Sequence, residues 1–194
     1  MSTRRLALTI VAVTVPSLVL AAVGVTHPTE LDATSAGYWR DLHIGILAVF
    51  PLLGFAPWLI VRGRSLVVSW IAGILGFVYA AFYSALDVLA GIGAGGLEHE
   101  GMHEAIGTAF HLGDALGLVG SVALVAACVF TGVWSVRTIG LAAIPGALLA
   151  LVGSLVFLKW HIFFPYGVIG QLLLAAGWAW LVVARHRAGR VAGS

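Results

Sequence analysis

The chain has 194 residues, of which 61% are hydrophobic and only 9% are charged, and its formal net charge is +2. Soluble domains carry about 25% charged residues, so this composition excludes an ordinary soluble protein. The few basic residues are scattered in short segments, which argues against nucleic-acid binding, and the single cysteine, Cys128, excludes a disulfide within the chain.

Six apolar runs are each long enough to cross a bilayer, which takes about 20 apolar residues in a helix. The expected spans are residues 6–25, 42–61, 66–92, 108–134, 139–160 and 166–184. The first run is longer than the roughly 7–15 apolar residues of a cleaved signal peptide, so we expect it to be retained. The pattern predicts an all-α polytopic membrane protein, with residues 1–194 forming a single transmembrane domain of six helices in one compact bundle.

The basic residues predict the orientation of these spans, because Lys and Arg concentrate in cytoplasmic loops. Eight of the ten lie at the ends that become cytoplasmic if both termini are inside: Arg4, Arg5, Arg62, Arg64, Arg137, Arg185, Arg187 and Arg190. The polar loops 26–41 and 91–107 are then extracytoplasmic. We therefore expect cytoplasmic termini in a plasma (inner) membrane, and the Ala-, Gly-, Val- and Arg-rich composition is typical of a high-GC bacterial genome.

This orientation gathers the chain's rare ionisable groups on one side. All eight acidic residues and six of the seven histidines fall on the outer side. Five of them come from four spans and lie in one layer near the outer interface: His43, Asp87, His111, Asp114 and His161. Ionisable groups in apolar spans are costly and mark functional sites by default, so we expect these side chains to converge on one cavity.

Helical spacing supports that convergence. His111 and Asp114 are three residues apart, and Tyr83 and Asp87 are four apart, so each pair shares a helix face. Tyr83, Asp87 and Asp114 are the candidates for acid–base work or for holding a ligating histidine. The hypothesis of a simple structural role is that Asp87 forms an ion pair that ties two helices together.

Imidazole and carboxylate are the usual ligands of zinc, iron and copper. The predicted metal ligands are His43, His111 and His161, with Asp87 and Asp114 as further ligands or as partners of the histidines. A second interpretation uses the same histidines as axial ligands of a b-type haem, paired as His43 with His111 or as His111 with His161.

Two other outer histidine motifs stand apart from this cluster. His99 and His103 lie four residues apart among three glutamates, a spacing with which one helical face can chelate a metal ion, although a solvated acidic loop is the simpler interpretation. His27 is followed by Pro28 directly after the first span, and it either caps the cavity or marks the end of the helix.

The sequence therefore predicts a transition-metal-binding membrane protein with an outward-facing His/Asp site, acting as an oxidoreductase or a hydrolase at the outer leaflet. Its substrate would be a lipid, a quinone or a small molecule from the outer side. The alternatives are the haem protein, a proton-coupled carrier that uses Asp87 and Asp114, and a non-catalytic subunit of an oligomer or a larger membrane complex.

Overall fold

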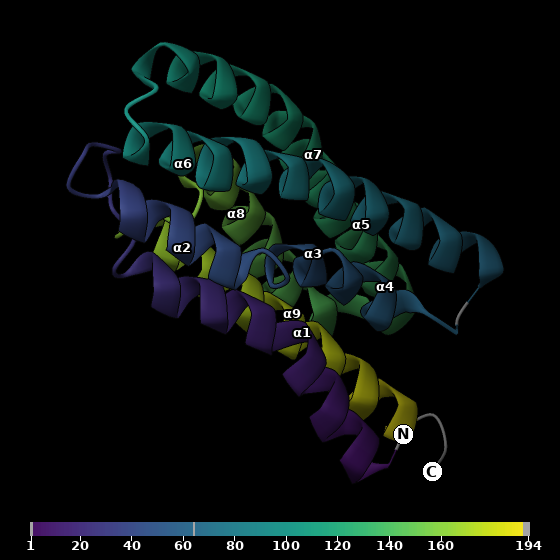
Figure 1. Ribbon diagram of the computed structural model, residues 1–194. Helices are drawn as coiled ribbons and strands as arrows, with labels where there is room; N and C mark the ends of the chain where they lie inside the picture. Colours follow the sequence, from purple (N-terminus) through teal and green to yellow (C-terminus); the bar gives the residue numbers. More distant parts are fainter. Residues whose placement is uncertain (1, 64, 192–194) are drawn as a thin grey trace.

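The computed structural model describes residues 2–63 and 65–191 and shows only helices and the turns between them (Figure 1). Arg64, one of the basic residues used to predict the orientation, lies outside the described residues. The helices are α1 (Thr3–Gly24), α2 (Ala36–Ile46), α3 (Phe50–Leu53), α4 (Phe55–Val61), α5 (Leu66–Leu86), the π-helix η1 (Asp87–Gly93), α6 (Ala94–His99), α7 (His103–Ile139), the 3-10 helix η2 (Gly140–Ala143), α8 (Ile144–Trp160) and α9 (Tyr166–Val191).

Four helical stretches in the described residues are long and apolar enough to cross a membrane: Thr3–Gly24, Leu66–His99, His103–Trp160 and Tyr166–Arg190. The bent pair Ala36–Ile46 and Phe50–Val61 makes a fifth if it is taken as one span. The stretch from His103 contains both α7 and α8, which pack against each other. The all-helical fold is confirmed; the count of six spans and the side on which the termini lie stay predictions.

The second expected span is broken. It bends by 43° between α2 and the α3–α4 segment. Pro51 follows the break and Gly54 separates α3 from α4. Gly54 packs directly against the backbone of Gly76 on α5, and a side chain on either glycine would overlap the other helix. The break therefore combines a proline that disrupts the helical hydrogen bonds with an unusually close helix contact.

Most of the predicted second outer loop is helical. The chain continues from α5 through η1 and α6, and α7 already begins at His103. Gly91 and Gly95 let η1 and α6 lie against α2, because a side chain at either position would overlap residues of that helix. Trp39 on α2 fastens this contact by donating its indole N–H to the carbonyl of Ala90 at 3.1 Å.

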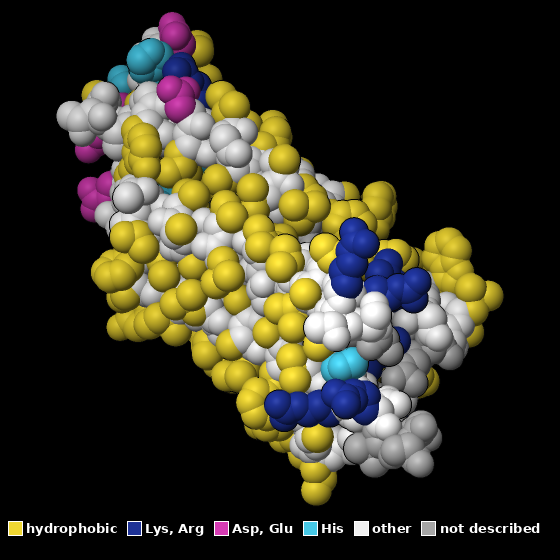
Figure 2. Space-filling model, turned by 90° about the horizontal axis from the view of Figure 1, so that it is seen from below, with side chains coloured by type: hydrophobic (Ala, Val, Ile, Leu, Met, Phe, Trp, Pro, Cys, Tyr) yellow, Lys and Arg dark blue, Asp and Glu magenta, His cyan; other side chains and the backbone are white. Residues whose placement is uncertain are grey.

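The two ends of the bundle differ in charge. Figure 2 shows Lys and Arg side chains gathered mainly at one end, where a histidine also lies, acidic side chains with further histidines at the other, and hydrophobic side chains between them. α1 begins and α9 ends at the same end of the bundle (Figure 1). The acidic end holds α2, η1, α6 and the end of α8, and His43, in the last turn of α2, belongs to the candidate site.

Candidate metal centre

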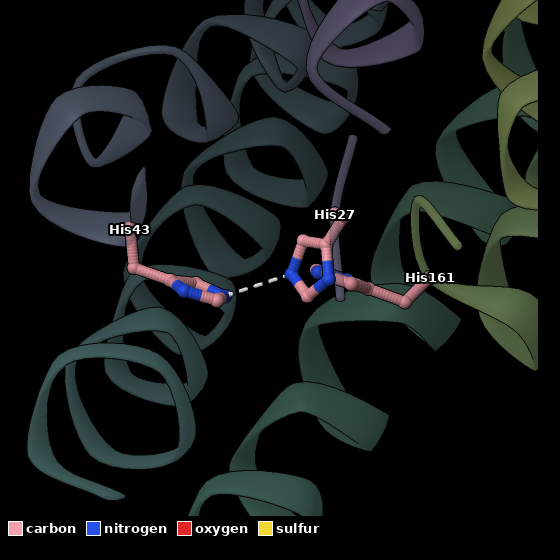
Figure 3. Close-up of side chains that lie close together, drawn as sticks. All are labelled: His27, His43 and His161. Atoms are coloured by element: carbon pink, nitrogen blue, oxygen red, sulfur yellow. Dashed lines mark hydrogen bonds between the residues drawn. The ribbon is translucent and has the colours of Figure 1, made fainter. Parts of the chain in front are cut away.

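Three histidines that are distant in sequence meet at the acidic end of the bundle: His27, His43 and His161 (Figure 3). Each offers one ring nitrogen, and the three nitrogens lie within 4.8 Å of one another. His27 and His43 are buried, and His161 is partly exposed. His27 follows α1, His43 lies on α2, and His161 directly follows α8, so the cluster joins three separate parts of the chain.

Each histidine uses Nδ1 for a hydrogen bond to the protein. His27 Nδ1 lies 2.6 Å from the carbonyl oxygen of Pro28, and His43 Nδ1 lies 2.7 Å from that of Trp39. A carbonyl oxygen only accepts, so Nδ1 carries the proton in both rings. His161 Nδ1 is hydrogen-bonded to the hydroxyl of Tyr83 at 2.5 Å. All three rings thus keep Nε2 for a shared partner, the arrangement that normally orients metal-ligating histidines.

The Nε2 atoms of His27 and His43 lie 3.3 Å apart. With both protons on Nδ1, the two Nε2 atoms face each other as lone pairs, so in the neutral rings neither can donate to the other. A metal ion between them removes this conflict. Nitrogen ligands about 2.0–2.1 Å from a tetrahedral zinc are about 3.3–3.4 Å apart, which equals 1.63 times the bond length. The distance between the Nε2 atoms of His27 and His43 therefore already matches that between two nitrogen ligands of a tetrahedral zinc ion.

Burial keeps the His27 ring in the ligating form. Desolvation lowers the pKa of His27 to about 4, outweighing the opposing hydrogen bond to Pro28. His27 is thus neutral at pH 7, as metal binding requires.

Aromatic side chains form the wall around the histidines. The His27 ring lies 4.9 Å from Trp39 and 4.7 Å from Phe163, both edge to face. The His161 ring stacks on Phe50 with centroids 5.3 Å apart. These contacts restrict the rotation of the imidazoles and exclude water from their flanks, so the positions of the nitrogens are set by packing.

Local backbone features place two of the rings. Gly91 on η1 packs on His43, and a Cβ there would overlap the imidazole ring. His161 has φ 50°, in the left-handed region, and its N–H caps α8 by donating to Phe157 at 2.9 Å. Left-handed backbone is rare in residues other than glycine, and it is maintained only where surrounding structure fixes it. Here it ends α8 and turns the His161 ring toward the other two.

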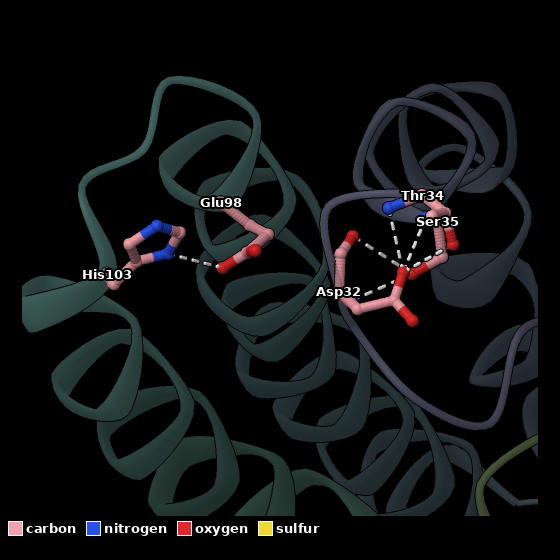
Figure 4. A network of polar contacts seen from close by, with 5 residues as sticks. All are labelled: Asp32, Thr34, Ser35, Glu98 and His103. Carbon is pink, nitrogen blue, oxygen red and sulfur yellow. Dashed lines mark hydrogen bonds and ion pairs between the residues drawn. The ribbon is translucent and has the colours of Figure 1, made fainter.

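The loop that links His27 to α2 is held by a network around Asp32 (Figure 4). The Asp32 carboxylate accepts from the N–H of Thr34 at 2.8 Å, from its hydroxyl at 2.6 Å and from the N–H of Ser35 at 2.9 Å. These bonds, above all that from the Thr34 hydroxyl, hold the pKa of Asp32 below its usual value. The network fixes the start of α2 relative to the segment that carries His27.

The three histidines line a cavity of about 890 Å³. Its other walls come from α5, η1, α7 and α8, and include Tyr83, Leu86, Leu118, Phe157 and Leu158. A metal bound by the three Nε2 atoms would thus keep an open coordination position next to a large pocket. Three protein ligands with an open position are typical of catalytic zinc sites, whereas structural sites are closed.

Several predicted site residues are in or beside this centre. His43 and His161 are in the cluster, Tyr83 binds His161, and Asp114 lines the cavity. Asp87 is completely buried on η1, and neither carboxylate oxygen has a hydrogen-bond partner among the described residues. In particular, no ion pair of Asp87 is present in this part of the chain, contrary to the hypothesis that it ties two helices together.

The structure does not bring the remaining predicted ligands to the cluster. His111 is exposed on α7, and it is absent from the three-histidine group that the described residues form. His103 pairs instead with Glu98 at 2.9 Å between α6 and α7 (Figure 4). His27 takes the place expected for His111; its signal in the sequence was its location in the outer layer directly before a proline.

No model of a known protein family, no curated protein and no solved structure matches this chain.

Proposed function

We propose that this chain is a multi-pass membrane protein that holds one transition-metal ion at His27, His43 and His161 on the extracytoplasmic side. The observation that carries the proposal is the meeting of three imidazoles whose Nδ1 atoms are all engaged by the protein while their ring nitrogens converge within 4.8 Å. Three nitrogen ligands without a carboxylate suit zinc or copper better than non-haem iron, whose open sites use two histidines and a carboxylate.

The proposed orientation follows from the charges. Six crossings with both termini in the cytoplasm place the basic end of Figure 2 inside and the histidines outside, in agreement with the excess of Lys and Arg in cytoplasmic loops. α7 and α8 then cross separately, consistent with their packing against each other.

When bound, the metal supplies a Lewis acid or a redox centre with room for one more ligand. The chain contributes fixed imidazoles, a Tyr83 hydroxyl against His161, and an aromatic enclosure that limits water. This combination supports hydrolytic or oxidative chemistry on a molecule that occupies the cavity. A b-type haem is less well supported, because both of its predicted ligand pairs use His111, which is exposed and outside the three-histidine group of the described residues.

The decisive experiment is metal analysis together with an absorption spectrum of the detergent-purified chain. We expect one zinc or copper ion per chain and no Soret band. His27→Ala should lose the metal, whereas His111→Ala, which removes an exposed histidine from the same end of the bundle, should retain it.

Equal metal content in the unmodified chain and His27→Ala would refute the centre. A Soret band would identify a cytochrome. A sample that stays metal-free after incubation with zinc and with copper would favour the carrier or the non-catalytic subunit.

A further inference from the structure

A second pocket lies at the basic end of the bundle, opposite the three histidines of the metal centre. It has a volume of about 270 Å³ and is lined by residues of α1, α4 and α9 and by Arg62, which directly follows α4. Its polar side chains are Thr9, Arg62, Arg185 and His186. Figure 2 shows a histidine between Lys and Arg side chains at this end. We call this cavity the basic pocket.

The positive charge of the basic pocket is not balanced by the helices that form it. Neither Asp nor Glu occurs in α1, α4 or α9, and the eight acidic residues of the chain fall within residues 30–41 and 87–114. Arg62 and Arg185 therefore share a small cavity whose described lining contains no carboxylate. Like charges in one cavity repel each other, and a bound anion offsets that repulsion.

The two guanidinium groups are held in place by the protein. Arg185 donates to the carbonyl of Ile60 through Nη1 and to that of Arg62 through Nη2, the latter at 3.2 Å. The Arg62 guanidinium lies over the Trp58 ring, 5.1 Å from its centroid, in a cation–π arrangement. A ligand that binds between them therefore requires little further ordering of these long side chains, which favours its affinity.

The polar groups of the basic pocket are mainly hydrogen-bond donors. Guanidinium groups donate and never accept. Nδ1 of His186 is shielded from solvent and has no hydrogen-bond partner among the described residues, so an acceptor in the pocket would satisfy it. The ligand that matches is an anion rich in acceptors. Phosphate fits this description, and its oxygens pair with arginine through two parallel hydrogen bonds.

We propose that the basic pocket binds a phosphate group, held by Arg62, Arg185 and His186. Its volume is just below the roughly 300–1,000 Å³ of small-molecule sites, which suits a phosphate or a phospholipid head group better than a whole lipid. In the orientation proposed above, the pocket lies on the cytoplasmic side, where basic pockets between membrane helices bind anionic head groups. The site is independent of the metal centre.

The test is thermal unfolding of the detergent-purified chain at constant ionic strength. It is titrated with inorganic phosphate, with dihexanoylphosphatidylglycerol and with dihexanoylphosphatidylcholine, whose cationic head opposes the arginines. We expect phosphatidylglycerol to raise the midpoint in a saturable way, with an affinity about tenfold or more above that of phosphatidylcholine.

The arms of this titration distinguish the source of the phosphate. Stabilisation by both inorganic phosphate and phosphatidylglycerol, in competition with each other, would indicate a soluble phosphate compound. Stabilisation by phosphatidylglycerol alone would indicate a lipid head group. No stabilisation by either, or equal affinities for phosphatidylglycerol and phosphatidylcholine, would overturn the proposal.

A pair of variants at Gly189 tests the charge of the ligand. Gly189 lines the basic pocket, and a Cβ there meets open space, so a longer side chain can enter. Gly189→Glu and Gly189→Gln add side chains of nearly equal size that differ in charge. The Glu variant should bind the stabilising anion about tenfold or more weakly than the Gln variant, because its carboxylate occupies the arginine donors. Equal affinities of the two variants would contradict an anion site.

A second pair separates the pocket from the general charge of this end. Arg62→Gln should weaken binding about tenfold or more, whereas Arg190→Gln, which removes an exposed arginine outside the pocket lining, should change it by less than about twofold. Equal losses would show only attraction to the basic end and would overturn the site. The Gly189 pair decides the question even if Arg62→Gln does not fold, and metal content should be unchanged in all four variants.

Discussion

Tyr83→Phe tests whether the hydrogen bonds behind the histidines set the affinity of the centre. The Tyr83 hydroxyl is the partner of His161 Nδ1 in the described structure, at 2.5 Å, and Tyr83 is itself buried. With Nε2 facing the metal, Nδ1 carries the proton and donates to the tyrosine oxygen. The substitution deletes that oxygen and nothing else, leaving a ring N–H without an acceptor in a largely aromatic enclosure.

The size of the effect follows from the cost of the unpaired donor. Leaving a buried donor unsatisfied costs about 1–3 kcal/mol, which corresponds to a loss of about 5- to 150-fold in metal affinity. This agrees with the roughly 10- to 100-fold losses that follow removal of groups behind metal ligands. We therefore expect Tyr83→Phe to bind zinc or copper about 10- to 100-fold more weakly, with one metal per chain still bound at saturation.

The chain supplies a matched control. Tyr79 precedes Tyr83 by one turn on α5, the two rings stack with centroids 5.3 Å apart, and the buried Tyr79 hydroxyl has no hydrogen-bond partner in the described part of the chain. Tyr79→Phe removes the same atom from the same helix face without touching a histidine, so metal affinity should stay within about twofold. The thermal stability of the Tyr79→Phe variant should equal or exceed that of the unmodified chain, because a buried hydroxyl without a hydrogen-bond partner is removed.

The assay is a competition titration of each purified variant against a chromophoric chelator at pH 7.5, with thermal unfolding followed in parallel. Tyr83→Phe and Tyr79→Phe affinities that are equal within error would refute the reasoning, because the hydroxyl on His161 would then have no influence on the site. A complete loss of metal accompanied by unfolding would assign Tyr83 a structural role instead.

Three further predictions concern packing, buried charge and metal linkage. Gly91→Ala should push the His43 ring aside and weaken metal binding by at least tenfold, although no ligand is removed. The control is Gly96→Ala, where a Cβ meets open space and metal affinity should not change. Titration against the same chelator compares the metal affinities of the two variants. Asp87→Asn should keep or raise the thermal midpoint, because it replaces a buried unpaired carboxyl with a neutral amide. A midpoint lowered by several degrees would reveal an ionic partner for Asp87. Metal at 100 times its dissociation constant should raise the free energy of unfolding of the unmodified chain by about 2.7 kcal/mol and leave that of His27→Ala unchanged. An equal rise in the thermal midpoint of both proteins would contradict a three-histidine centre.

The helical class and the charge asymmetry were predictable because they depend on local composition. A run of apolar residues must form a helix in a bilayer whatever its neighbours are, since no other single segment satisfies its own backbone hydrogen bonds there. The positions of Arg and Asp along the chain likewise predict the two differently charged ends seen in Figure 2, because they do not depend on how the helices pack. The break after α2 lies beside Pro51, which is visible in the sequence, whereas the close contact of Gly54 with Gly76 on another helix was not predictable in this way.

The candidate site was predictable as a layer and only partly as a set of residues. Depth in the membrane follows from counting residues, so His43 and His161 were expected at the same end of the bundle, and the structure brings them together there. Which side chains face one another depends on helix rotation, which sequence spacing fixes only within one helix. His111 shares a face with Asp114 as expected, yet that face leaves His111 exposed.

By itself, then, the sequence determined that the chain is helical, apolar and polarised, with most basic residues at one end and the acidic residues and most histidines at the other. The tertiary structure alone decided that His27 joins His43 and His161. That meeting requires α1 to approach the end of α8 at Gly24, where a Cβ would overlap the backbone of Ile162, and η1 to lie against the His43 ring at Gly91. Such contacts join residues more than 40 positions apart in sequence, and their geometry depends on every helix packed between them.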